Sequence, residues 1–298
     1  MGGGYIAQQI VNGLILGSMY ALVAIGFSMI YGIIRLINFA HGDVVMIGAF
    51  VTLALMQVAG LPFVLVAAGA LAAGAVVGVL IERGAFRPMR GAPQVTGFIA
   101  SLAVSIMLQN LGILLLTAQP RNFTFPAALQ RVINAGPVSF RVIDLVIMVS
   151  ALGLMVMVML LVRRTRLGMA MRATAENLDV ARLMGININR TILAAFAMGS
   201  ALAGIAGLMW GGKFGQIDPL LGYVPGLKSF VAAVIGGVGS IPGAILGGYI
   251  LGLAEVLFVG LLPPIYSAYR DAFVFGTLIV ILLIMPNGLL GGDKGERA

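Results

Sequence analysis

The sequence has 298 residues, of which 60 % are hydrophobic and only 9 % are charged, and its mean hydropathy is +1.09. A soluble globular domain carries about 25 % charged residues, so this composition excludes a soluble protein and indicates an all-α integral membrane protein, with one transmembrane domain over residues 1–298. The chain has no cysteine, which excludes disulfides and thiolate sites. Its net charge of +8 is more typical of basic loops beside a membrane than of a nucleic-acid-binding surface.

A membrane-spanning helix needs about 20 mostly apolar residues, and six stretches meet this requirement. They lie at residues 6–30, 61–81, 95–118, 142–162, 191–212 and 272–290. Two further apolar regions are irregular, because the run at 44–59 is short and the run at 226–262 is interrupted by glycines and a proline. We therefore expect a polytopic helical bundle of about eight transmembrane helices with two broken or re-entrant segments. The first apolar run is too long for a cleavable signal peptide, so we expect it to stay as a helix.

The first break in the apolar pattern contains Asn38, His41 and Asp43. Polar groups at membrane depth are costly and persist where they line a cavity or pair internally. The break fits either an unwound stretch along a solute path or an ordinary cytoplasmic turn, and the spacing alone slightly favours the turn. His41 is the only histidine of the chain, and a metal site needs three or four ligands, so no metal is expected.

The longest polar stretch between two spans covers residues 163–187 and has helical periodicity. It predicts one amphipathic helix, with charges that pair along one face, apolar residues on the other, and a glycine that ends it. The residues that carry this prediction are Arg172, Glu176, Asp179, Ala181, Arg182 and Gly185. Such a helix suits docking in a groove of a soluble partner, and it equally suits an interfacial helix that lies on lipid headgroups.

The second break covers residues 236–243, where four glycines and Pro242 prevent a regular helix. Backbone groups exposed by a broken helix can contact a solute, whereas the alternative is a tight turn between two helices. Both breaks together give the candidate solute path Asn38, His41, Asp43, Gly236, Gly237 and Ser240. We also expect the two breaks to be equivalent points of an internal repeat.

Alternation of the spans divides the 18 basic residues 12 to 6 between the two sides of the membrane. Because basic residues gather in cytoplasmic loops, the N-terminus is expected outside and the C-terminal tail, with Lys294 and Arg297, inside. The six basic residues assigned to the outer side are Arg121, Arg131, Arg141, Lys213, Lys228 and Arg270.

Several sequence blocks resemble, in the same order, those of LivH-type permeases, which are membrane subunits of bacterial ABC importers for branched-chain amino acids. The likeness extends from about residue 8 to residue 290, and its blocks are Tyr31 to Ile34, Ile37 to Asp43, Ile81 to Pro88, Arg172 to Asn187 and Gly236 to Ala244. One departure is Asp43, which stands where a glutamate is common in the family.

This resemblance implies an inner-membrane permease that forms the path for leucine, isoleucine and valine. The implied partners are an identical or paralogous permease subunit, two cytoplasmic ATPase subunits, a periplasmic amino-acid-binding protein and the lipid bilayer, with no nucleic acid. No cofactor is implied for this chain, because ATP is used by the partner subunits. The two breaks would lie along the translocation path, and residues 172–185 would seat on the ATPase.

Three other functions compete with this one. A permease for urea or short amides in the same ABC family has similar sequence blocks. An autonomous secondary transporter or channel usually carries ionisable groups within its spans for ion coupling, and only Glu255 qualifies here. An intramembrane enzyme is disfavoured because the chain has no HExxH motif, no paired aspartates in facing spans and no cysteine. A P-loop-like match at residues 207–213 lacks the magnesium-binding hydroxyl and ends an apolar helix, so no nucleotide hydrolysis is expected.

Overall fold

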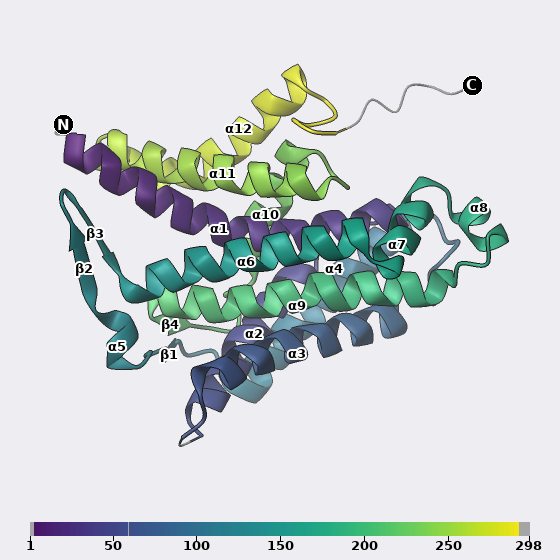
Figure 1. The fold of residues 1–298 in the computed structure, drawn as a ribbon, viewed down its shortest axis with the longest axis horizontal. Coiled ribbons are helices and arrows are strands. Elements are labelled where there is room, and N and C mark those ends of the chain that lie inside the picture. The colour runs from purple at the N-terminus through teal and green to yellow at the C-terminus, as the bar shows by residue number, and fades with distance from the viewer. Residues whose placement is uncertain (1–2, 59, 292–298) are drawn as a thin grey trace.

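The computed structural model describes residues 3–58 and 60–291 and shows helices packed side by side along the longest dimension of the molecule (Figure 1). Among the described residues, seven helical segments are long and apolar enough to cross a membrane, by length and composition. They are α1 (Gly3–Ile34), α3 (Phe63–Ile81) with its π-helical extension η1 (Glu82–Phe86), α4 (Gln94–Leu116), α6 (Val142–Arg164), α9 (Ile188–Phe214), α11 (Ile241–Leu261), and η2 (Pro264–Tyr269) with α12 (Arg270–Ile284). The predicted polytopic all-α bundle is confirmed.

Two apolar helices are too short to cross a membrane alone. They are α2 (His41–Met56) and α10 (Tyr223–Gly236), of 16 and 14 residues. A helix rises about 1.5 Å per residue, so each covers less than the roughly 30 Å hydrocarbon core of a bilayer. The predicted irregular region 226–262 therefore resolves into one short helix followed by the full-length α11.

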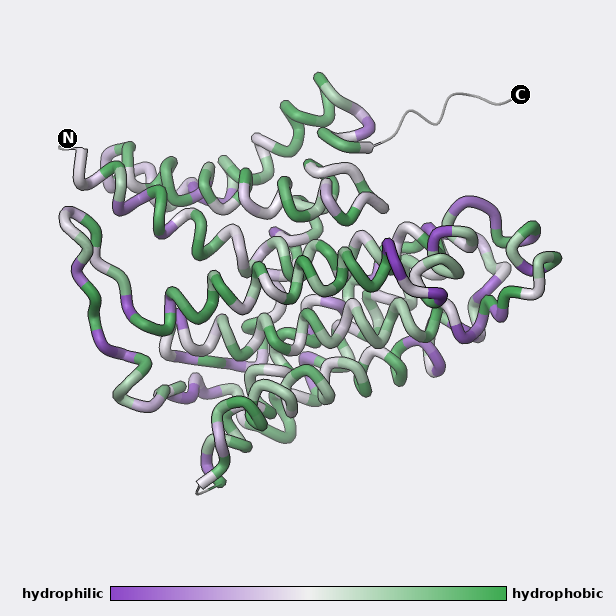
Figure 2. Tube along the Cα trace, viewed as in Figure 1, coloured by the Kyte–Doolittle hydropathy of each residue, from purple (hydrophilic) through white to green (hydrophobic). Residues whose placement is uncertain are grey.

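Polar connections gather at the two ends of the bundle (Figure 2). One end, here called the hairpin end, holds the N-terminus of α1 and the small elements β1 (Arg121–Asn122), α5 (Ala127–Gln130), β2 (Val132–Ala135), β3 (Val138–Arg141) and β4 (Gln216–Ile217). There β2 and β3 form an antiparallel hairpin, and β1 pairs with β4. The opposite end, here called the α7 end, holds α7 (Arg166–Glu176) and α8 (Leu178–Leu183).

Two three-helix units repeat within the bundle, α1–α2–α3 and α9–α10–α11. Each consists of a long helix, a connector, a short helix, a turn and a second long helix. The first helices run in opposite directions, since α1 begins at the hairpin end and α9 begins at the α7 end (Figure 1). In this repeat, residues 35–40 correspond to residues 215–222, and the turn at 57–62 corresponds to the turn at 237–240. The expected equivalence of the breaks at 38–43 and 236–243 is therefore wrong.

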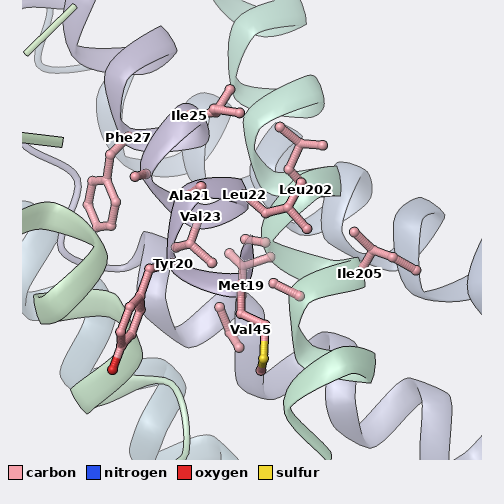
Figure 3. Close-up of a cluster of buried hydrophobic side chains, with 14 of the residues drawn as sticks. Met19, Tyr20, Ala21, Leu22, Val23, Ile25, Phe27, Val45, Leu202 and Ile205 are labelled. Carbon is pink, nitrogen blue, oxygen red and sulfur yellow. The ribbon is translucent and has the colours of Figure 1, made fainter. Parts of the chain in front are cut away.

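Glycines allow the long helices of the two units to cross at close range. A Cβ on Gly17 of α1 would lie 2.9 Å from the Tyr249 Cα of α11, and a Cβ on Gly74 of α3 would lie 3.1 Å from the Gly204 Cα of α9. Small residues at such crossings are typical of helix association in lipid. Around these crossings α1 is buried against α2 and α9, as shown by Met19, Leu22, Val45, Leu202 and Ile205 (Figure 3).

Candidate functional site

The N-termini of the two short helices meet inside the bundle. Helix α2 begins beside Gly26, about two turns before the end of α1. A Cβ on Gly42 would lie 2.6 Å from the Gly222 carbonyl oxygen and 2.9 Å from the Gly226 Cα, so the two backbones touch. The first N–H groups of a helix have no partner within the helix, and its N-terminus carries a partial positive charge. The contact of Gly42 with Gly222 and Gly226, here called the half-helix junction, therefore brings two sets of such donors together.

The three polar residues of the first break lie at this junction, and each is buried. Asp43 accepts a hydrogen bond of 3.0 Å from the Gln109 side chain in α4. The His41 ring packs edge-on against Phe27, with 4.6 Å between ring centroids. The Asn38 side-chain amide has no hydrogen-bond partner among the described residues. Burial of all three favours the interior break over an ordinary solvated turn, while their contact with a solute stays a prediction.

Three phenylalanines close the space beside the half-helix junction. The ring of Phe230 lies 5.9 Å from Phe27 and 6.1 Å from Phe39, between centroids. The cavity left between these rings, Gly42 and Asp43 measures only about 30 Å³, which is room for about one water molecule. The junction is therefore a constriction in this conformation.

The second break forms the turn from α10 to α11 near the α7 end. Gly237 adopts φ +103°, a region that favours glycine, and its amide lies against Gly288. The Ser240 hydroxyl accepts a hydrogen bond of 3.2 Å from the Gly243 amide and so caps α11. A Cβ on Gly236 would collide with the Gly243 carbonyl. The tight turn explains Gly236, Gly237 and Ser240 structurally, and their place along a path stays a prediction.

A cavity of about 590 Å³ opens near the hairpin end among α1, α9, α10 and α11. This volume is within the range of small-molecule sites, roughly 300–1,000 Å³. Its walls are mostly aliphatic and aromatic, and include Leu16, Tyr20, Trp210, Leu221, Val224 and Val256. We call it the outer cavity.

A network of four charges lies at the wall of the outer cavity. Lys228 Nζ is 2.7 Å from Glu255 Oε1 and 2.8 Å from Asp271 Oδ1. Arg270 Nε lies 3.3 Å from the same Glu255 oxygen, and the Tyr20 hydroxyl donates to Glu255 Oε2 at 2.9 Å. The sequence assigned Lys228 to the outer side of the membrane, and the structure places this residue inside α10, where it is buried. In the sequence, Glu255 was the residue that indicated such a network, because a carboxylate inside an apolar segment needs a charged or polar partner.

A second cavity, of about 400 Å³, lies near the α7 end and is here called the inner cavity. It is lined by Tyr31, Gly32, Arg35, Arg172, Ala175, Glu176, Val238, Gly239, Ser240 and Gly291. Arg172 and Glu176 of the predicted amphipathic helix and Ser240 of the second break thus meet at one cavity. Arg35 donates a hydrogen bond of 3.3 Å to the Ala175 carbonyl and connects the end of α1 to α7.

The predicted amphipathic helix is divided into two. Helix α7 ends at Glu176, and the Asn177 side chain accepts hydrogen bonds from the amides of Asp179 and Val180, which starts α8 in a new direction. The prediction that Arg172, Glu176, Asp179 and Arg182 share one helix face is therefore wrong, and among the described residues no ion pair joins Arg172 to Glu176 or Asp179 to Arg182. The predicted end at Gly185 is confirmed by its φ of +80°.

Helix α8 has one buried apolar side chain that packs on the bundle and several apolar side chains that are exposed. Ala181 is buried, so it belongs to the contact of α8 with the bundle. Leu183 is 86 % exposed and Met184 is 77 % exposed, and Leu178 and Val180 beside them are also exposed. These four exposed apolar residues lie in or directly after α8, at one end of the molecule (Figure 1), and are here called the α8 patch.

Comparison with known proteins agrees with the architecture. The profile of the family described as "Branched-chain amino acid transport system / permease component" matches residues 9–283. The chain belongs to this permease family. It is 41 % identical to the high-affinity branched-chain amino acid transport system permease protein LivH of Escherichia coli K12, over 98 % of both chains. It is 42 % identical to the corresponding protein BraD of Pseudomonas aeruginosa, over 97 % of both chains.

More distant similarity covers less of the permease. The xylose transport system permease protein XylH of Escherichia coli K12 is 39 % identical over 99 residues, which is 31 % of this chain. No solved structure matches. The permease is a multi-pass membrane protein of a transport system.

Proposed function

We propose that this permease forms the path for leucine, isoleucine and valine in an ATP-driven importer of the ABC class. The observation that carries the proposal is the identity of 41–42 % with permeases named for branched-chain amino acids, over nearly the full length of both chains. The aliphatic walls of the outer cavity support the same solute class, because a branched side chain gains free energy when it leaves water.

The partners follow from the same proposal. Two cytoplasmic ATPase subunits supply the energy, a second permease subunit completes the membrane unit, and a periplasmic binding protein delivers the solute. The α8 patch suits the ATPase, because exposed apolar side chains on a short helix fit a groove on a soluble protein. The Arg35 contact with Ala175 provides a route from α7 to the inner end of α1. ATP binds to the ATPase subunits and to no site in this chain.

We place the α7 end in the cytoplasm and the hairpin end outside the cell membrane, with the N-terminus outside and the C-terminus inside. The support is the gathering of basic residues, since Arg163, Arg164, Arg166, Arg172, Arg182 and Arg190 all lie in or beside α7 and α8. Lys294 and Arg297, which the sequence adds to this side, lie outside the described residues.

A single cysteine is expected to report this orientation without background, because the chain has no native cysteine. Asn177→Cys should react with a membrane-impermeant maleimide only after the cytoplasmic face is opened. Asn122→Cys, in the exposed β1, should react in intact spheroplasts. Labelling of Asn122→Cys from the cytoplasmic face alone would reverse the topology.

The solute class is tested by ATPase stimulation in the purified complex. With the binding protein present, leucine, isoleucine and valine should raise the rate of ATP hydrolysis, and urea and acetamide should leave it at the basal rate. Stimulation by urea or acetamide alone would favour the alternative within the ABC class, a permease for urea or short amides.

A further inference from the structure

The charge network at the outer cavity has the chemistry of an amino-acid head group. Resting on the proposed function, we propose that Lys228, Glu255, Arg270 and Asp271 form a recognition site for the ammonium and carboxylate of an aliphatic α-amino acid. The bound side chain then lies against the aliphatic wall of the outer cavity, at Leu16, Val224 and Val256. The site lies on the extracellular side of the half-helix junction and is separate from the breaks at 38–43 and 236–243.

The arrangement of charges fits a zwitterion. The network has two cations and two carboxylates, so it offers one partner of each sign to a neutral solute that carries both. Neither end group of an amino acid can leave water without a charged or hydrogen-bonding partner. Charge-assisted hydrogen bonds are the strong ones, and Lys228, Glu255 and Arg270 all face the cavity.

Exposure within the network indicates how a solute enters it. The Lys228 and Glu255 side chains are 2 % and 4 % exposed, whereas Asp271 is 55 % exposed. Asp271 is therefore the more accessible of the two carboxylates on Lys228, and it is the one that a solute carboxylate can replace. The carboxylate of the solute takes the place of the Asp271 carboxylate on Lys228, its ammonium pairs with Glu255, and Asp271 keeps Arg270, whose Nε lies 3.6 Å from its Oδ1. Each charge keeps an opposite partner throughout this exchange.

The contribution of the charge network to the stability of the fold does not explain why it is present. A buried ion pair often contributes nothing over apolar residues of the same volume, because desolvation offsets the attraction. Ionisable side chains within membrane spans more often mark a solute path. Lys228 and Glu255 also come from α10 and α11, which belong to one repeat, and the binding of a solute between them would act directly on the half-helix that enters the junction.

Exchange with an internal carboxylate also keeps the affinity low. A solute gains only the difference between its own contacts and the Asp271 contact that it replaces, because the Lys228 charge is already satisfied. Weak binding suits a transport site, which has to release what it receives.

A single tryptophan near the proposed site can report solute binding by its fluorescence. Trp210 is the only tryptophan, it lines the outer cavity, and its ring lies 5.5 Å from that of Tyr20, whose hydroxyl binds Glu255. In the purified full-length chain in lipid nanodiscs, leucine at millimolar concentrations should change the Trp210 emission. Leucine amide, which lacks the carboxylate, and 4-methylpentanoate, which lacks the ammonium, should need at least about tenfold higher concentrations, because each loses a charged hydrogen bond.

Two variants and a matched control test the assignment. Lys228→Gln should weaken the leucine response at least about tenfold. In the double variant Lys228→Gln/Glu255→Gln, the buried Glu255 carboxylate is removed together with its lysine, so the variant is less prone to misfold than Lys228→Gln alone. It should respond equally to leucine and to 4-methylpentanoate. Arg131→Gln removes a positive charge at the hairpin end from an exposed side chain outside the lining of the outer cavity, and it should respond as the wild type does.

The outcomes separate this site from the proposed function. Leucine uptake by the wild-type complex is measured in parallel. If the complex imports leucine while Trp210 emission is unchanged, or if the double variant keeps the wild-type preference for leucine over 4-methylpentanoate, the head-group site is wrong and the proposed function stands. If the complex imports no branched-chain amino acid, both are wrong.

Discussion

Replacing Gly42 with valine is expected to abolish solute uptake while the protein remains inserted in the membrane. A Cβ at this position would lie 2.6 Å from the Gly222 carbonyl oxygen and 2.9 Å from the Gly226 Cα. These are backbone atoms, so they cannot move away as a flexible side chain could. Overpacking of this kind costs about 1–3 kcal/mol or more, and here it forces apart the two half-helices that form the constriction. Uptake should fall to background in vesicles that contain normal amounts of the protein.

The control for this substitution is Gly153→Val in α6, where a Cβ meets no atom of the described residues within 4 Å. It makes the same change in a spanning helix and should leave uptake unchanged. Gly42→Ala adds a single methyl group and should reduce uptake less than valine does, with thermal stability measured for each variant. Wild-type uptake by Gly42→Val would show that the half-helix junction has no part in transport.

The second large effect is expected at the α8 patch. Leu183→Asp combined with Met184→Asp should weaken association with the ATPase subunits at least about tenfold, because each removes an exposed apolar anchor and truncation of an interface anchor typically costs more than 1 kcal/mol. Co-purification of the ATPase on a tagged permease measures the loss, and uptake should fall with it.

Val132→Asp is the matched control, because Val132 is also exposed but lies in β2 at the opposite end. Normal ATPase co-purification with the double variant would place the docking surface elsewhere. Ala181→Asp is unsuitable for this test, because Ala181 is buried and an aspartate there would disrupt the packing of α8 itself.

Local rules predicted much of the structure. The apolar runs predicted the spans. The polar residues Asn38, His41 and Asp43 indicated a break in the apolar pattern, but their spacing slightly favoured a cytoplasmic turn, and their burial in the structure is what identifies the break as an interior one. Gly185 marked a helix end, because its φ of +80° is favoured by glycine. Each of these features is determined by residues close in the sequence.

The features that the sequence did not predict depend on competition between local interactions or on contacts between residues far apart in the sequence. Asn177 satisfies the first amides of α8 with its side chain, and this cap outweighs the periodicity that favoured a single helix. The connector before α10 ends in a buried contact that glycine content did not reveal, because the position of Gly222 is set by its contact with Gly42. The sequence did not reveal Lys228 as part of a buried charge network, because its partners, Glu255 and Asp271, are 27 and 43 residues further along the chain.

The central claim is that this chain forms the path of an ATP-driven importer for branched-chain amino acids, and uptake into proteoliposomes tests it most directly. The permease is reconstituted with its partner permease and ATPase subunits, radiolabelled leucine and the binding protein are supplied outside, and ATP is enclosed. The account predicts that leucine accumulates above its external concentration, and that accumulation stops when ATP is replaced by a non-hydrolysable analogue or when the binding protein is omitted. Equal leucine flux without ATP and without the binding protein would contradict the account and indicate an autonomous transporter or channel.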